Sequence, residues 1–124
     1  MKRRIAVVED NPDNRLLVQA ILEDDYEVSE FETGREAVEG LAEARPEVVL
    51  LDISLPEMDG TEVLAWIRTH HTLGPTPVIA LTAHAMAGDR ERYLEAGFDD
   101  YVSKPIVDEE VLTGAIRRWL DRPR

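Results

Sequence analysis

The sequence predicts an α/β domain built on a five-stranded parallel sheet with crossover helices. Short apolar runs alternate with longer amphipathic segments along the whole 124-residue chain, an alternation typical of strands joined by helices. Hydrophobic residues make up 44% of the chain, which is enough to bury one core of ordinary size. We therefore expect one compact domain over residues 1–124.

Five short runs are the strand candidates. In chain order they are IAVVE near residue 5, EVSEF near 27, EVVLLD near 47, VIALT near 78 and DYVSK near 100. Continuous apolar runs indicate strands that helices cover on both faces. The second run instead alternates between apolar and polar residues, so we expect it to be an edge strand.

Apolar side chains at spacings of three and four residues predict helices between and after these strands. They occur near residues 17–24, 37–42, 63–67 and 112–119. The segment HAMAGDRERYLEAGF, residues 84–98, is more polar and reaches Gly97, a typical helix stop. We expect a helix there with a largely exposed face.

The charge balance, the absence of Cys and the N-terminal residues argue against several classes of protein. The chain has 14 Lys and Arg against 26 Asp and Glu, a net charge of −12, which repels a nucleic-acid backbone. It has no Cys, so a disulfide framework and a thiolate metal site are excluded. The basic start MKRRIAVVED has only four apolar residues before Glu9, too few for a signal peptide. We expect a cytoplasmic protein that binds neither nucleic acid nor membrane.

Polar side chains follow four of the five predicted strands. Glu9 and Asp10 end the first strand, Asp52 the third and Thr82 the fourth, and Lys104 ends the fifth. Ligands of open parallel sheets bind outside the carboxyl ends of the strands. We therefore expect these side chains to form one site.

Three carboxylates in one site need compensating positive charge. Two carboxylates 4 Å apart repel by roughly 4 kcal/mol at an effective dielectric constant near 20. Lys104 supplies one positive charge, and an oxygen-rich site without His or Cys suits a hard ion such as Mg²⁺ that also takes phosphate oxygens. The pattern predicts a site for a phosphoryl group beside a metal ion.

Four motifs in this order resemble the receiver domain of bacterial two-component response regulators, in particular the single-domain, chemotaxis-regulator-like form. They are VVEDN, LLDISLPEMDG, ALTAHA and DYVSKP, and the resemblance covers the whole chain. It implies a doubly wound, flavodoxin-like fold with strand order 2-1-3-4-5 and helices on both faces. It also implies a signalling switch that has no output domain of its own.

The resemblance implies the chemistry of the site. Asp52 matches the family's phosphoacceptor, which takes the phosphoryl group from a phosphohistidine of a histidine kinase or histidine phosphotransfer domain. Mg²⁺, or Mn²⁺ in its place, is expected on Asp10 and Asp52 directly, on Glu9 through water, and on the backbone carbonyl of Ser54.

The remaining motif residues match a switch. Lys104 matches the lysine that pairs with the phosphoryl oxygens, and Thr82 the hydroxyl that turns toward them. Tyr101 matches the aromatic residue that then moves inward and changes the surface of the fourth helix, fifth strand and fifth helix. Ser54 and His84, each two residues beyond a site residue, are expected to tune the lifetime of the phosphate.

Simpler interpretations exist for each residue alone. A strand-end Asp often caps the next turn, as we expect of Asp59 before Gly60. Thr82 would also fit as a satisfied hydroxyl, Lys104 as a solvated charge and Tyr101 as strand packing. Their joint occurrence favours the switch.

Two other functions compete with the switch. An aspartate-nucleophile phosphatase would carry its nucleophile on the first strand with a second Asp two residues later, where this chain has Ser54 after Asp52. A degenerate receiver would lack an acid, the Thr or the Lys. We therefore expect no enzyme acting on outside substrates, only a chain that catalyses its own phosphorylation and dephosphorylation.

Other properties stay open from the sequence. The domain either relays phosphate, binds a target, or forms part of a hybrid kinase. The cognate kinase, the downstream target, the phosphate lifetime and the oligomeric state are not fixed by the motifs.

Overall fold

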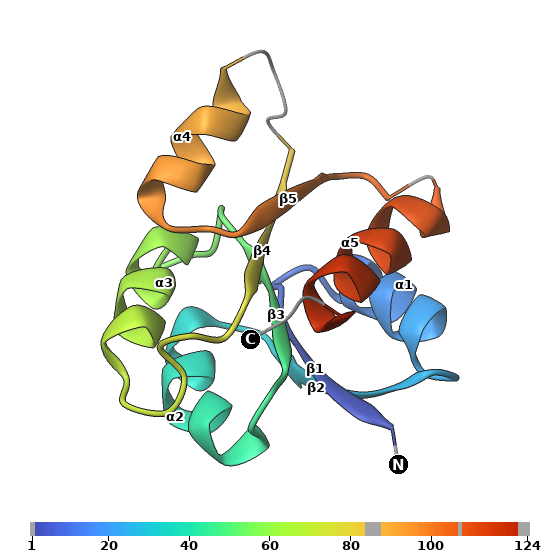
Figure 1. The fold of residues 1–124 in the computed structure, drawn as a ribbon, viewed down its shortest axis with the longest axis horizontal. Coiled ribbons are helices and arrows are strands. Elements are labelled where there is room, and N and C mark those ends of the chain that lie inside the picture. The colour runs from blue at the N-terminus through green and yellow to red at the C-terminus, as the bar shows by residue number, and fades with distance from the viewer. Residues whose placement is uncertain (1, 84–87, 107, 122–124) are drawn as a thin grey trace.

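The strands of the molecule form a single twisted sheet (Figure 1). The computed structural model describes residues 2–83, 88–106 and 108–121. Within them the strands are β1 (Arg3–Val8), β2 (Tyr26–Phe31), β3 (Val48–Asp52), β4 (Val78–Thr82) and β5 (Asp100–Ser103). All pair in parallel in the order β2-β1-β3-β4-β5. The expected α/β fold and strand order are confirmed.

Helices cover both faces of this sheet (Figure 1). They are α1 (Pro12–Leu22), α2 (Gly34–Ala44), α3 (Gly60–Thr69), α4 (Asp89–Ala96) and α5 (Glu109–Asp121). Helices α1 and α5 lie on one face, and α2, α3 and α4 on the other. Among the described residues, no helix combines the length and the apolar run that crossing a bilayer requires.

Each face of the sheet has its own apolar core. Val49 and Leu51 of β3 pack toward α2 and α3, whereas Val48 and Leu50 pack toward α1 and α5. Side chains of a strand alternate between faces, so a strand covered on both faces needs apolar residues throughout. Strands β3 and β4 are buried along their whole length, while β2 has only half-buried and exposed residues and lies at the edge of the sheet, as expected.

Capping residues define where the helices begin. The side chains of Asn11, Thr33 and Asp59 accept hydrogen bonds from backbone N–H groups in the first turns of α1, α2 and α3. These bonds satisfy donors that have no partner within the helix. The expectation that Asp59 is a structural cap is confirmed.

Helix α4 begins later than the polar segment suggested. Its N-cap is Gly88, and it ends at Gly97, whose φ of 113° suits glycine. The helix stop at Gly97 and the exposed character of the helix are confirmed, with Tyr93 its buried residue. Residues 84–87 of the expected helix lie outside the described residues.

Gly60 lets α3 begin directly against the end of β3. A Cβ atom at this position would lie 2.5 Å from the carbonyl oxygen of Asp52 and 2.7 Å from the Cα of Ile53. The Gly60 N–H donates to the Ile53 carbonyl at 3.0 Å. The glycine is therefore needed for close approach of two backbone segments, and it positions the loop that follows Asp52.

Arg68 joins the segments that enter β4 and β5. Its guanidinium donates to the carbonyls of Gly74 (3.1 Å), Thr76 (2.7 Å) and Gly97 (2.8 Å), and to the carboxylate of Asp99 (2.7 Å). The same Asp99 oxygen accepts from the N–H of Val78 at 2.8 Å. The amino ends of β4 and β5 are thus held together by one side chain.

The Asp59 cap generates a prediction for stability. Asp59→Ala is expected to lower the free energy of unfolding by about 1 kcal/mol at pH 7, whereas Asp59→Asn should retain most of it because Asn also caps helices. The Thr61 hydroxyl and the Glu62 N–H lower the pKa of Asp59. The contribution is therefore present above the ordinary carboxyl pKa and is lost as the pH falls through the lower folded-state pKa.

Urea unfolding at pH 7 and pH 3 measures this loss. Asp24→Ala, at an exposed turn, is the control. An equal loss for Asp24→Ala, or a loss for Asp59→Ala that is the same at both pH values, would contradict the assignment.

Candidate functional site

The predicted site residues lie at the carboxyl ends of the strands. Glu9 and Asp10 follow β1, Asp52 is the last residue of β3, and Lys104 follows β5. Asp52 is 2% exposed and Glu9 is fully buried. Two carboxylates are thus buried at the edge of the sheet, which requires compensation.

Lys104 supplies that compensation. Its Nζ lies 2.9 Å from Oδ2 of Asp52 and 3.1 Å from Oε1 of Glu9. The backbone continues the connection, because the N–H of Lys104 donates to the carbonyl of Thr82 at 2.7 Å. The lysine, predicted to meet a phosphoryl group, therefore already bridges two of the acids.

The three acids are arranged so that they can share a cation. Glu9, Asp10 and Asp52 each offer a carboxylate oxygen, and these three oxygens lie within 4.8 Å of one another. Carboxylate oxygens are the ligands that Mg²⁺ and Mn²⁺ prefer. The donor set therefore fits the ion expected from the sequence.

The two buried carboxyl groups, Glu9 and Asp52, have pKa values shifted in opposite directions. Burial, with a further contribution from Asp52, raises the pKa of Glu9 to about 7. For Asp52, burial favours the neutral form, but hydrogen bonding with Glu9 and Lys104 outweighs it and holds the pKa of Asp52 below its ordinary value. Asp52 is therefore the one of the two carboxylates that stays ionised.

The same contacts keep Lys104 charged. Burial alone would lower the pKa of its ammonium group, but the hydrogen bonds and charges of Asp52 and Glu9 raise it. An ammonium group that keeps its proton provides a fixed positive charge beside Asp52.

The start of α1 makes contacts with the acids that the motifs did not predict. The Asn11 N–H donates to Glu9 at 3.2 Å, and the Asn14 side chain donates to Glu9 at 3.3 Å. Arg15 donates to the backbone carbonyls of Glu9 (2.9 Å) and Asp10 (3.2 Å). The sequence signal for these contacts was Asn11-Pro12, which follows the acid pair directly and starts the helix there. A helix that starts so close to the acids brings its first turn next to them.

The loop after Asp52 contributes a backbone group. The Ser54 N–H donates to Oδ1 of Asp52 at 3.0 Å, and the Ser54 side chain is exposed. The predicted roles of the Ser54 carbonyl as a metal ligand and of its side chain in phosphate lifetime stay predictions. His84, the other predicted lifetime residue, lies outside the described residues.

Thr82 faces helix α4 in this structure. Its Oγ1 lies 2.9 Å from the hydroxyl of Tyr93, and both side chains are buried. Tyr101, the predicted switch residue on β5, is half-buried, and its ring centre lies 6.2 Å from that of Tyr93. The sequence did not single out Tyr93, because only the rotation of α4 about its axis shows which face is buried.

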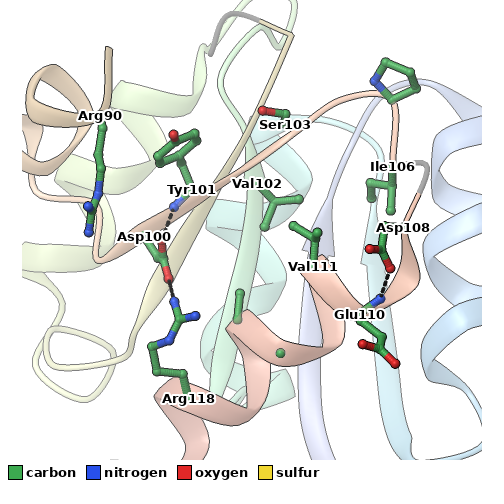
Figure 2. Close-up of a pocket in the computed structure, with 13 residues that line it drawn as sticks. Arg90, Asp100, Tyr101, Val102, Ser103, Ile106, Asp108, Glu110, Val111 and Arg118 are labelled. Carbon is green, nitrogen blue, oxygen red and sulfur yellow. Dashed lines mark hydrogen bonds and ion pairs between the residues drawn. The ribbon is translucent and has the colours of Figure 1, made fainter. Parts of the chain in front are cut away.

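A groove of about 850 Å³ lies beside Tyr101, between β5 and α5 (Figure 2). Tyr101, Ile106 and Val111 contribute apolar surface, and Arg90 stands at one side. Arg118 of α5 pairs with Asp100 at 2.7 Å, which joins the helix to the strand. A rearrangement at Tyr101 would therefore change the walls of this groove.

A comparison with protein families identifies the family of the chain. The family described as the response regulator receiver domain matches residues 5–117. The chain belongs to this family. Acceptance of a phosphoryl group within a two-component system is the typical role of such receiver domains.

Curated relatives include receiver domains in two settings. The polar-differentiation response regulator DivK of Brucella anthropi is 42% identical over 107 residues, which cover 86% of this chain and 87% of that protein. The sensor protein GacS of Pseudomonas syringae pv. syringae is 40% identical over 120 residues, which cover 94% of this chain but only 13% of GacS.

A solved receiver domain gives a direct structural parallel. The receiver domain of a sensor histidine kinase from Pseudomonas aeruginosa PAO1 is 36% identical, with a TM-score of 0.88 and coverage of 98% of this chain and 100% of that one. That crystal structure has a magnesium ion coordinated in its active-site cleft.

The raised pKa of Glu9 generates a prediction for this receiver domain without metal. The folded chain holds the Glu9 proton up to about pH 7, against an ordinary pKa of 4.5. Stability from this group is therefore fully present below about pH 4.5 and is lost as the pH rises to about 7. Relative to Glu9→Gln, which does not titrate, wild type should become progressively less stable over that range.

Urea unfolding in EDTA at several pH values between 4.5 and 8 measures the difference between the two proteins. Glu43→Gln, at an exposed position, should show no such trend relative to wild type. A difference between wild type and Glu9→Gln that does not change with pH would contradict the prediction.

Proposed function

We propose that Asp52 is the phosphoacceptor of a two-component signalling switch. The observation that carries the proposal is the contact of Lys104 with Asp52 at 2.9 Å, beside two further acids at the same edge of the sheet. The contact supports an Asp52 carboxylate that is ionised and lies next to a fixed positive charge at the edge of the sheet.

The transfer forms one bond and breaks another. An Asp52 carboxylate oxygen attacks the phosphorus atom of a phosphohistidine and forms an O–P bond. The P–N bond breaks with its electron pair on the imidazole nitrogen, which takes up a proton from the solvent and leaves as neutral imidazole. Dephosphorylation follows when water attacks the phosphorus atom, releases inorganic phosphate and restores the Asp52 carboxylate. The chain thus catalyses only its own modification.

Glu9, Asp10 and Asp52 are the side chains that would hold Mg²⁺ or Mn²⁺, together with the Ser54 carbonyl. When bound there, the ion supplies positive charge that offsets the negative phosphoryl oxygens. The chain's own residues position the group: Lys104 pairs with its oxygens, and the Ser54 N–H orients the Asp52 carboxylate.

The output is a change of surface. Thr82 turns toward the phosphoryl oxygens, Tyr101 moves inward, and the face of α4, β5 and α5 changes with it. The groove beside Tyr101 supports this part of the proposal, because Tyr101 lines it. Ser54 and His84 set how long the phosphate lasts.

The partners are a histidine kinase or a histidine phosphotransfer domain on the input side and a protein target on the output side. A net charge of −12 argues against nucleic acid as a direct partner. We place the protein in the cytoplasm, where such kinases present their phosphohistidine.

Phosphorylation of Asp52 is tested directly with a small phosphodonor. Wild type should gain one acid-labile phosphate in the presence of Mg²⁺ and none in EDTA, because the acid cluster repels the donor without the ion. Mass spectrometry after borohydride trapping locates the label.

Asp52→Asn should gain no phosphate, while the control Asp24→Asn, at an exposed turn, should gain as much as wild type. Label that persists on Asp52→Asn, or that forms equally well in EDTA, would overturn the assignment.

Metal binding is tested by thermal unfolding. At a free Mg²⁺ concentration ten times the dissociation constant, binding to the folded state adds about 1.4 kcal/mol, which raises Tm by about 4–8 °C in a domain of this size. Asp10→Asn and Asp52→Asn should each show a smaller rise, because one ligand charge is gone.

Sodium chloride at matched ionic strength separates site binding from general screening. A rise in wild type no larger than that in sodium chloride, or a full rise in both variants, would show that these acids do not hold the ion.

A further inference from the structure

Tyr93 is the buried residue of an otherwise exposed helix. It is 6% exposed, and its ring centroid lies 6.4 Å from that of Phe98 and 6.2 Å from that of Tyr101. The ring therefore packs where α4 meets the end of β4 and the first half of β5. A movement of this ring would therefore move α4 or change the contact of α4 with β5.

The hydroxyl of Tyr93 reaches the site through Thr82. The two oxygens are 2.9 Å apart, and Thr82 is 2% exposed. A hydrogen bond between two buried hydroxyls fixes the direction of both, and Thr is stiff about χ1 because its Cβ is branched. The bond therefore favours the Thr82 rotamer that points its hydroxyl to α4.

The alternation of side chains along β3 and β4 directs Thr82 and Asp52 toward opposite faces of the sheet. In β4, Val78 and Ala80 belong to the core beneath α2, α3 and α4, while Ile79 and Leu81 belong to the opposite core. Alternation assigns Thr82 to the α4 face. Asp52 pairs in register with Leu81, and by alternation within β3 its side chain starts from the α1 and α5 face.

We propose that Tyr93 is a positioning residue that holds Thr82 toward α4 and makes α4 sense the phosphorylation of Asp52. A phosphoryl group on Asp52 competes with the Tyr93 hydroxyl for the Thr82 hydroxyl. When the phosphoryl oxygens capture Thr82, the hydrogen bond to Tyr93 is lost, and the ring and its helix readjust against Tyr101. The inference rests on the proposed function, since it takes Asp52 as the phosphoacceptor.

The test uses beryllofluoride, a phosphoryl analogue, with the intact chain and saturating Mg²⁺. The solved receiver domains of DrrB and of Klebsiella pneumoniae RstA are activated by this analogue. Tyr93→Phe keeps the ring and removes the hydroxyl. In this variant beryllofluoride no longer has to displace the Tyr93 hydroxyl from Thr82. The dissociation constant for beryllofluoride, measured by calorimetry, should therefore fall by about 2- to 10-fold.

A double-mutant cycle shows whether the effect passes through Thr82. In a Thr82→Val background the hydroxyl that Tyr93 holds is absent, so Tyr93→Phe should change the dissociation constant less than twofold. Tyr26→Phe, which removes a tyrosine hydroxyl on β2, is the matched control and should bind as wild type does. An unchanged dissociation constant in Tyr93→Phe, or the same fall in the Thr82→Val background, would overturn the inference.

Nuclear magnetic resonance of wild type gives a second test that needs no variant. Three-bond couplings should report one χ1 rotamer of Thr82 without beryllofluoride and a different one with it. The same rotamer in both states would overturn the inference. In Tyr93→Phe, the amide shifts of Leu94 and Glu95 on binding should be smaller than in wild type, and shifts of equal size would count against the coupling.

The outcomes separate this inference from the proposed function. If wild type does not bind beryllofluoride, or if Asp52→Asn binds it equally well, the phosphoacceptor assignment fails. If wild type binds it through Asp52 while Tyr93→Phe behaves as wild type, the phosphoacceptor assignment stands and the role of Tyr93 is wrong.

Discussion

The bridge from Lys104 to Asp52 and Glu9 is the interaction on which the rest of the site depends. Two carboxyl groups buried at a sheet edge repel each other when both are ionised, and the interior gives them little screening. One ammonium group at 2.9 Å and 3.1 Å lets both stay in place. Breaking a buried pair by removing one partner costs more than the pair contributes, because the other charge is left buried. Lys104 therefore stabilises the folded chain even without a ligand. The same position is required for its proposed contact with a phosphoryl group.

Backbone packing delivers these side chains to one place. The parallel register brings the ends of β1, β3 and β5 to the same edge of the sheet. Gly60 then lets α3 begin against the backbone of Asp52, and the first turn of α1 closes over Glu9 through Asn14. The first turn of α1 thus contacts the acid cluster through Asn14, and the positive dipole end of this helix favours negative charge there. Position along the chain matters less here than which end of each element a residue occupies.

Much of this arrangement was predictable from the sequence, and the reasons are physical. Buried parallel strands read as continuous apolar runs, so β3 and β4 were found with their ends at Asp52 and Thr82. Those ends predict the residues of the site. The pattern did not reveal the contacts of Asn14 or Tyr93, because a contact made by a helix depends on its rotation and docking against the sheet. In the polar helix α4, one aromatic residue gives too little periodicity to fix that rotation.

The arginine that joins Gly74, Thr76, Gly97 and Asp99 has a mechanical consequence. Arg68 holds the amino ends of β4 and β5 together, whereas their carboxyl ends finish beside the acid cluster. A movement of Thr82, such as the proposed switch requires, would therefore begin at the end of β4 that Arg68 does not hold.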